Sequence, residues 1–281
     1  NTTASFNTAL GQGAMLENTT GARNMAIGTN AYQNSDTESD NMAIGYNAML
    51  TNTAGGIENI AIGNFAMDAN TSGDRNVALG FHALGANNVG DSNTAIGYYT
   101  MVSNTSGIDN TAVGRRALMN NTTANDNTSV GMNSLYTNTG ASNTAVGKDA
   151  LFANTSAANN VAVGYKALTA NTSGTKNTAV GMEVMLSATE GSNNTALGYR
   201  AAGNLTTGDN NTCIGYNAGN YGNELTTGGG NLFVGAFCSP TGATNSDAHG
   251  FGYDLDCAAD YTTLGAGASD IRAAHGNVSW A

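Results

Sequence analysis

Three carboxylates near the C-terminal end come closest to a pattern that could do acid–base chemistry. Asp254, Asp256 and Asp260 follow one another at short spacing. A polysaccharide-cleaving site needs two carboxyl groups about 5 to 10 Å apart. Aspartate is equally common in turns, and no catalytic motif surrounds these residues. We therefore expect no enzymatic activity, and a polysaccharide-degrading spike is kept as the enzymatic alternative.

Cysteine and histidine show no metal-binding pattern. The chain has three of each, and none falls in a Cys-x-x-Cys or His-x-x-x-His spacing. Cys213 suits a small buried position, whereas Cys238 and Cys257 either pair or remain free thiols. We expect no catalytic residue, no metal site and no cofactor.

Aromatic side chains are the better candidates for binding. Residues 221–281 hold the single proline, the single tryptophan and an aromatic-rich segment, and binding surfaces favour such residues on a rigid scaffold. The predicted contact residues are Phe251, Tyr253, Asp254 and Asp256. A second set follows a recurring glycine and forms either a sugar-stacking stripe or a packed seam: Tyr46, Phe81, Tyr98, Tyr165, Tyr199 and Tyr216.

A short repeat positions all of these residues. The motif is Asn, any residue, Ala, an aliphatic residue and Gly, and successive copies start 16 to 18 residues apart. A degenerate copy follows 20 residues after the thirteenth. A fixed short period is typical of stacked repeat units. The copies start at Asn7, Asn24, Asn41, Asn59, Asn76, Asn93, Asn110, Asn127, Asn143, Asn160, Asn177, Asn194, Asn211 and Asn231.

One repeat has room for a single coil of a β-solenoid. Seventeen residues are too few for a strand–helix–strand unit, which needs about 30. The motif alternates like a strand, and clusters such as Asn171-Thr172-Ser173-Gly174 are typical of turns. We predict an all-β, parallel β-solenoid of about 13 coils, each with two short strands and two turns. At a strand spacing of about 4.8 Å the stack is about 60 Å long.

Two apolar columns run through the repeats. The fourth motif residue is always aliphatic, and five residues later comes a column of Met or Leu. We expect these columns to face each other inside the coil. The small Ala and Gly of the motif are then expected to face a neighbouring chain at a symmetry axis. The motif Asn side chains are expected to stack as an amide ladder that satisfies turn backbone.

Composition limits the partners. The formal net charge is -11, which disfavours nucleic acid and anionic membranes. No stretch reaches the roughly 20 apolar residues of a membrane span. The pattern changes after residue 220, so we predict a repeat shaft over residues 1–220. Residues 221–281 are predicted to form a C-terminal cap or tip, since solenoids need atypical ends.

Two resemblances follow from these residues. Over residues 1–220 the Asn-x-Ala-Ile-Gly coil resembles the head repeats of trimeric autotransporter adhesins, and also repeat arrays in viral tail fibres of the bacteriophage type. The segment Ser269-Asp270-Ile271-Arg272, continuing to Ala281, resembles the junction that precedes an endosialidase-type intramolecular chaperone. The resemblance implies a left-handed homotrimeric fibre and a transient C-terminal chaperone that is removed by cleavage near Ala281.

The expected function is therefore a structural fibre that also attaches to a host. A tail fibre is expected on the surface of the virion. The alternative function is an autotransporter adhesin head, which is expected to be extracellular or on the cell surface. The expected partner is a host cell-surface glycan or protein receptor, bound by residues 221–281. A further alternative is an ice-binding solenoid, because Thr105, Thr172 and other threonines recur at one phase of the repeat.

Overall fold

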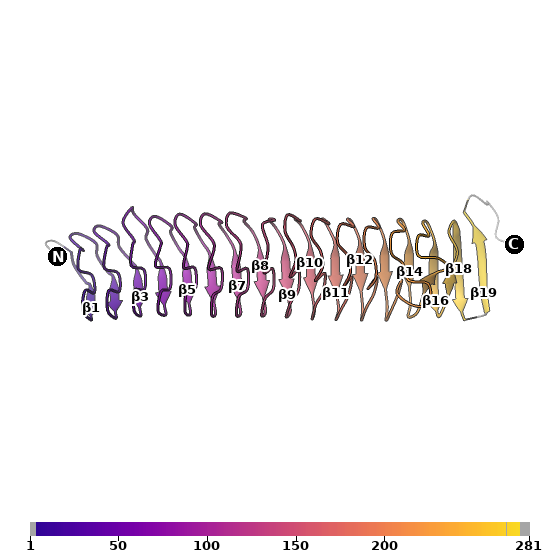
Figure 1. The fold of residues 1–281 in the computed structure, drawn as a ribbon, viewed down its shortest axis with the longest axis horizontal. Helices are drawn as coiled ribbons and strands as arrows, with labels where there is room; N and C mark the ends of the chain where they lie inside the picture. Colours follow the sequence, from indigo (N-terminus) through magenta and orange to yellow (C-terminus); the bar gives the residue numbers. More distant parts are fainter. Residues whose placement is uncertain (1–3, 268, 276–281) are drawn as a thin grey trace. The chain divides into compact units, whose positions relative to one another are not determined.

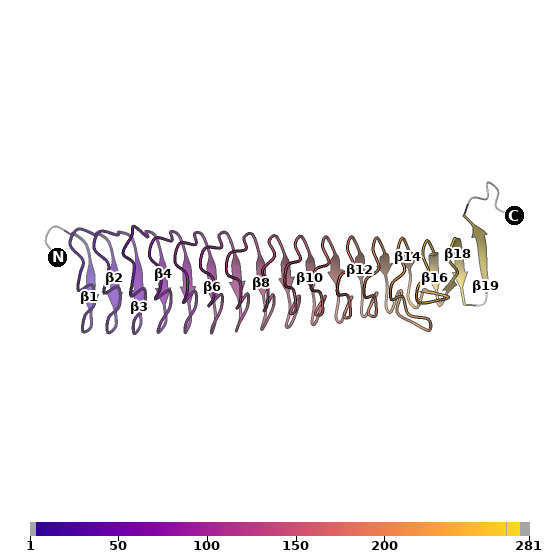
Figure 2. The same cartoon turned by 45° about the horizontal axis from the view of Figure 1, so that its top comes forward.

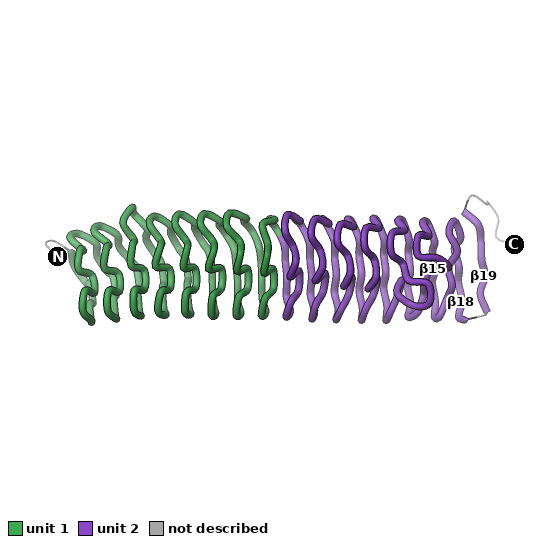
Figure 3. Tube along the Cα trace, viewed as in Figure 1, with its two compact units in different colours: residues 1–142 green, residues 143–281 purple. Residues whose placement is uncertain are grey.

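The computed structural model describes residues 4–267 and 269–275. These residues form β-strands, turns and bends, with no helix among them, and hence none that could span a bilayer. The chain divides into two compact units, Asn1–Ser142 and Asn143–Ala281, which Figure 3 colours separately. Trp280 and the predicted cleavage position near Ala281 lie outside the described residues.

Unit 1 is a stack of parallel three-residue strands, one in each coil (Figure 1). Each strand pairs in parallel with the next at the same motif position, for example Ala9 with Ala26. The strands are β1 (Thr8–Leu10), β2 (Met25–Ile27), β3 (Met42–Ile44), β4 (Ile60–Ile62), β5 (Val77–Leu79), β6 (Thr94–Ile96), β7 (Thr111–Val113) and β8 (Thr128–Val130).

Unit 2 repeats this arrangement and adds a different end. Strands β9 to β14 pair in parallel, and β14 continues the parallel ladder to β16 and β18. Strand β19 is antiparallel to β18, and β15 pairs with β17 apart from the main ladder. The strands are β9 (Thr144–Val146), β10 (Val161–Val163), β11 (Thr178–Val180), β12 (Thr195–Leu197), β13 (Thr212–Ile214), β14 (Leu232–Val234), β15 (Ser239–Pro240), β16 (His249–Tyr253), β17 (Asp256–Cys257), β18 (Tyr261–Ala266) and β19 (Ser269–Ala274).

Each unit is thus a parallel β-solenoid with coils of about 17 residues, as the period predicts. Within unit 2 the ladder passes residue 220 without interruption, because β13 pairs with β14 and β14 with β16. The boundary between residues 1–220 and 221–281 remains a prediction, as does the handedness of the coils.

The coils of β14 and β16 each have a second strand of two residues, β15 and β17, but the second strand expected in each coil is absent from the coils of β1 to β13. In its place the chain follows a broad turn, visible opposite the strands in Figure 2. Arg116 and Leu118 have φ angles of 58° and 52°. Left-handed residues at alternate positions are incompatible with extended strand geometry. The turn still bonds to its neighbours: the Arg116 N–H donates to the Tyr98 carbonyl and the Leu118 N–H to that of Ser134, at 3.0 and 2.9 Å.

The strand faces are the reverse of the expected ones. Ala112 in the motif and Leu118 in the second column are both fully buried, so the Met/Leu column is inside as predicted. The fourth motif residue points outward instead, with Leu79 and Leu197 43% and 47% exposed. The coil is so narrow that only a small side chain, Ala in most coils and Ser at Ser129, fits opposite a Met or Leu of the second column, and successive strand residues point to opposite faces.

The motif glycine contacts its own chain. Gly114 has a φ of +129°, and a Cβ there would lie 2.8 Å from the carbonyl carbon and oxygen of Gly131. The close approach is therefore to the next coil, and the expectation of a neighbouring chain at this face is wrong. The left-handed φ is a second reason for glycine at this position.

Two asparagine ladders hold the turns together. The Asn93 N–H donates to Oδ1 of Asn76 at 2.9 Å, and Asn93 Nδ2 donates to the Gly107 carbonyl at 2.7 Å. Asn104, in the second ladder, donates through Nδ2 to the same carbonyl at 3.1 Å and to Asn87 Oδ1 at 2.9 Å. These buried amides replace water as partners of the turn backbone. The predicted amide ladder is confirmed.

The threonine row also bonds between coils. Thr105 Oγ1 donates to the Thr122 carbonyl at 3.0 Å, and Thr172 Oγ1 to the Thr189 carbonyl at 3.0 Å. These hydroxyl protons are engaged with backbone, so the row has a structural role in the coils.

Candidate functional site

The four predicted contact residues lie at the end of the unit 2 ladder. Phe251 and Tyr253 belong to β16, Asp254 follows it, and Asp256 starts β17. Phe251 is 39% and Tyr253 57% exposed, and both aspartates are exposed. β16 is paired on both sides, with β14 and with β18, so Phe251 and Tyr253 project from a rigid strand.

The structure brings two of the four together. Asp254 and Asp256 line a hollow of about 350 Å³ with Gly267, Asp270 and Arg272. Arg272 Nε lies 2.6 Å from Asp270 Oδ2, so the guanidinium of Arg272 neutralises Asp270 and not Asp254 or Asp256. The hollow is therefore acidic and favours a cationic or hydroxyl-rich ligand.

The two aromatic residues lie apart from this hollow. Tyr253 packs edge-on against Phe237, with ring centres 5.8 Å apart. Phe251 is in register with Val234 and Leu264, so it extends the outward aliphatic column. Asp260, the third carboxylate considered above, does not line the hollow.

The aromatic residues that follow motif glycines form separate clusters in the two units. In unit 1, Phe81 stacks on Tyr98 at 5.6 Å, and Tyr46 meets Phe65 edge-on at 5.3 Å. His82 and Tyr99, one position further along, complete a continuous row. Phe65, His82 and Tyr99 have left-handed φ angles. Sequence reasoning missed them, although their position beside the first column was a usable signal.

A second aromatic row lies in unit 2. Tyr199 stacks on Tyr216 at 5.2 Å, Tyr216 meets Phe237 at 5.2 Å, and Tyr221 meets Phe237 at 4.6 Å. Tyr216 and Tyr221 are each 49% exposed. Tyr165 is separate and has the Lys148 and Lys166 ammonium groups 5.6 and 5.4 Å from its ring centre.

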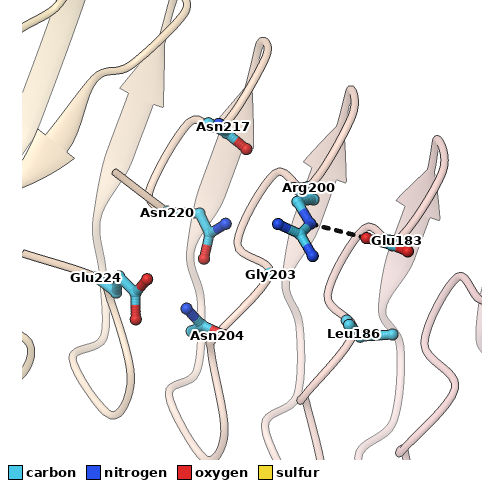
Figure 4. A pocket seen from close by; sticks show the side chains of 8 residues that line it. All are labelled: Glu183, Leu186, Arg200, Gly203, Asn204, Asn217, Asn220 and Glu224. Carbon is cyan, nitrogen blue, oxygen red and sulfur yellow. Dashed lines mark hydrogen bonds and ion pairs between the residues drawn. The ribbon is translucent and has the colours of Figure 1, made fainter. Parts of the chain in front are cut away.

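A polar hollow beside this second row was not predicted. It has a volume of about 160 Å³ and surrounds Gly203 (Figure 4). Arg200 Nε bonds to Glu183 Oε2 at 2.8 Å, and this bond raises the pKa of Arg200. The other polar residues that line the hollow are Asn204, Asn217, Asn220 and Glu224. The signal was the missing side chain at Gly203, which stands out only when all coils are aligned in register.

The cysteines are buried free thiols. Cys238 and Cys257 are unpaired with each other, and burial raises the pKa of Cys213 and of Cys257 to about 12 each. Thiols held protonated in this way are poor nucleophiles. Within the described residues no group of three or more His, Cys, Asp or Glu side chains is placed to hold a metal ion.

Comparisons with protein-family models, with curated proteins and with solved structures gave no match to this chain.

Proposed function

We propose that this chain is part of a homotrimeric viral tail fibre that attaches to a host cell through residues 221–281. The coils supply a rigid support that holds itself together by backbone and amide hydrogen bonds. The observation that carries the attachment role is the exposure of Tyr253, Asp254 and Asp256 near the end of the unit 2 ladder, where the two aspartates line an acidic hollow. The partner is a host cell-surface glycan or protein receptor.

The outward strand face of unit 1 supports self-association. In β2 to β5 the second and fourth motif residues are apolar, and both point away from the coil. Met25, Met42 and Ile60 line a hollow of about 340 Å³ on this face. An apolar face that repeats over the four coils of β2 to β5 matches another copy of the same face. The proposed occupant is therefore a second and a third copy of this chain.

The position on a virion rests on the resemblance of residues 269–281 to a chaperone junction. Of that segment, Ser269–Ala274 forms β19, the antiparallel strand that follows the parallel ladder. The encoded sequence after Ala281 distinguishes the candidates. An intramolecular chaperone supports the fibre, and a stalk with a membrane anchor supports the autotransporter adhesin head.

Attachment is testable with fluorescently labelled whole chain on a panel of bacterial cells. We expect saturable binding to at least one strain, and at least a tenfold loss of affinity in a Tyr253→Ala, Asp254→Asn double variant. Tyr46→Ala, which removes a comparably exposed ring from unit 1, is the matched control and should bind normally. Unchanged binding by the double variant would place the receptor site elsewhere.

A further inference from the structure

The hollow in unit 2 exists because one repeat position lacks a side chain. The residue five places after the motif glycine is large in most coils, for example Leu50, Met119 and Leu186, but it is glycine at Gly85 and Gly203. Gly203 does not have a left-handed φ, so its backbone does not require glycine. A Cβ there would lie 3.0 Å from Asn220 Nδ2, at the wall of the hollow. The missing side chain therefore lets the Asn220 amide lie close to the Gly203 backbone, and the hollow is open beside them.

Two buried oxygens in this hollow lack donors. Oδ1 of Asn217 and Oδ1 of Asn220 are buried without a hydrogen-bond partner among the described residues. Both side chains line the hollow, together with Asn204 and the carboxylate of Glu224 (Figure 4). Buried acceptors without donors are unfavourable, and a ligand that brings donors relieves them.

The charges favour a neutral ligand over a metal ion. Arg200 shares the hollow and is paired with Glu183 at 2.8 Å, so a guanidinium already occupies part of the wall. That pair is neutral, so Glu224 carries the one uncompensated charge of the lining, and a single carboxylate holds a divalent cation weakly. The volume of about 160 Å³ also exceeds what a bare ion fills. The amide oxygens and the carboxylate accept hydrogen bonds, and the guanidinium donates them. A hydroxyl group can do both, so it can pair with every polar group of the lining.

Two tyrosines are sequence neighbours of lining residues, although neither belongs to the lining itself. Tyr199 and Tyr216 directly precede Arg200 and Asn217 in the chain, and their rings stack at 5.2 Å. The Arg200 guanidinium carbon lies 5.7 Å from the centre of the Tyr199 ring. Ligand sites typically combine apolar or aromatic surface with a few polar groups that fix orientation. A sugar ring presents both an apolar C–H face and a rim of hydroxyls.

We propose that the hollow around Gly203 binds one neutral pyranose unit of a glycan. The inference rests on the proposed attachment function for its biological role, and it adds a saccharide subsite on the coils of unit 2, separate from the Asp254 and Asp256 hollow. Asn217, Asn220 and Glu224 accept hydrogen bonds from sugar hydroxyls, and Arg200 donates to a hydroxyl or ring oxygen.

The test is saturation-transfer NMR on the whole chain with methyl glycosides of glucose, galactose, mannose, N-acetylglucosamine and N-acetylgalactosamine. We expect at least one glycoside to give a saturation-transfer signal that an excess of the corresponding free sugar suppresses. Gly203→Leu places in the hollow a side chain that other coils carry at this position, and it should weaken that binding at least tenfold. Gly85→Leu makes the same change at the equivalent position of unit 1 and should bind the sugar normally.

Asn220→Leu covers the case in which Gly203→Leu does not fold. It removes the amide at similar size and should also weaken sugar binding at least tenfold. Absence of a signal from all five glycosides overturns the proposal, as does equal binding by whichever of these two variants folds. Calcium binding that is lost in Gly203→Leu, without sugar binding, also overturns it by assigning the hollow to a cation.

The outcome is separable from that of the proposed function. Sugar binding without attachment to any cell contradicts the attachment function and leaves the saccharide site intact. Attachment that depends on Tyr253 and Asp254, without sugar binding, contradicts the saccharide site alone.

Discussion

At the scale of single residues, each motif glycine meets two requirements at once. Gly114 has a left-handed φ, and its Cα faces the Gly131 carbonyl so closely that any side chain would overlap it. Thr111, three residues earlier, is exposed, and other coils carry Ile or Val at this position. The two positions are close in sequence, but a larger side chain is expected to be tolerated at Thr111 and not at Gly114.

We therefore expect Gly114→Val to destabilise unit 1 by about 3 kcal/mol or more, since overpacking and backbone strain each contribute about 1 to 3 kcal/mol. Thr111→Val should change stability by no more than about 0.5 kcal/mol. Thermal unfolding of both variants measures the difference. Equal melting temperatures would show that the glycine contact is not tight in solution.

Tyr32 is a second residue whose environment is specific. It occupies the Met/Leu column, is fully buried, and its hydroxyl accepts from Asn41 Nδ2 at 2.7 Å and Asn52 Nδ2 at 3.3 Å. Ser35 takes the place of an asparagine in the second amide ladder, which leaves room for the ring. Burial also raises the pKa of Tyr32 strongly, so the hydroxyl stays protonated.

Tyr32→Phe should destabilise the protein by about 1 kcal/mol, the typical net value of a buried hydrogen bond. Tyr46→Phe, at an exposed ring, should have no measurable effect. Chemical denaturation gives both values. A Tyr32→Phe variant as stable as the parent would mean that Asn41 and Asn52 find equivalent partners without the hydroxyl.

At the scale of elements, we predict that the end of unit 2 loses stability in acid. His249 in β16 and His275 after β19 have ring centres 4.6 Å apart. Burial lowers the pKa of His249 below 6.5, the nearby His275 lowers it further, and Asp247 opposes both effects. Because the folded state binds the proton less readily than the unfolded chain, neutral His249 favours folding. This contribution to the free energy of unfolding is complete above about pH 6.5 and is lost as the pH falls below it.

We expect faster amide hydrogen exchange in β16 and β18 at pH 5 than at pH 7.5, after correction for intrinsic exchange rates. His249→Asn should reduce this difference, because it removes the titrating group. Strands β2 to β5 of unit 1 serve as an internal reference. The same pH dependence in both regions would exclude a local effect of His249.

The sequence predicted the coil period, the ladder of motif asparagines and the buried Met/Leu column, but it did not predict the second asparagine ladder or which strand face is inside. Alternation separates the two faces of a strand, and apolarity usually marks the inner one. Here Ala112 is inside and Leu79 outside, because the opposing Leu or Met already fills the coil. That competition for volume depends on coil width, which no local pattern encodes.

The candidate sites were predicted only in part. Asp254 and Asp256 were expected to act together, and they share one hollow, but their partners Asp270 and Arg272 come from β19. The hollow at Gly203 combines side chains from successive coils, about 17 residues apart, so its residues are neighbours only after stacking. Which side chains of successive coils lie next to each other depends on the register between the coils. That register became certain only with the strand pairing.

At the scale of the whole molecule, we propose that copies associate through the outward apolar face of unit 1. Ile44, Ile62 and Leu79 stack on this face of unit 1 through the parallel pairing of β3, β4 and β5. A charge introduced there disrupts a contact between copies, and it leaves the inward Ala and Leu core of the coil unchanged.

Light scattering coupled to size-exclusion chromatography at micromolar concentration tests this central claim most directly. The chain has a mass of 28.3 kDa, so a trimer has three times 28.3 kDa, about 85 kDa. We expect the whole chain to elute at the trimer mass, and Ile44→Asp, Ile62→Asp to dissociate it, while Ser106→Asp, in an exposed turn outside the strand face, does not. A stable, folded monomer of the parent chain under these conditions would contradict the account.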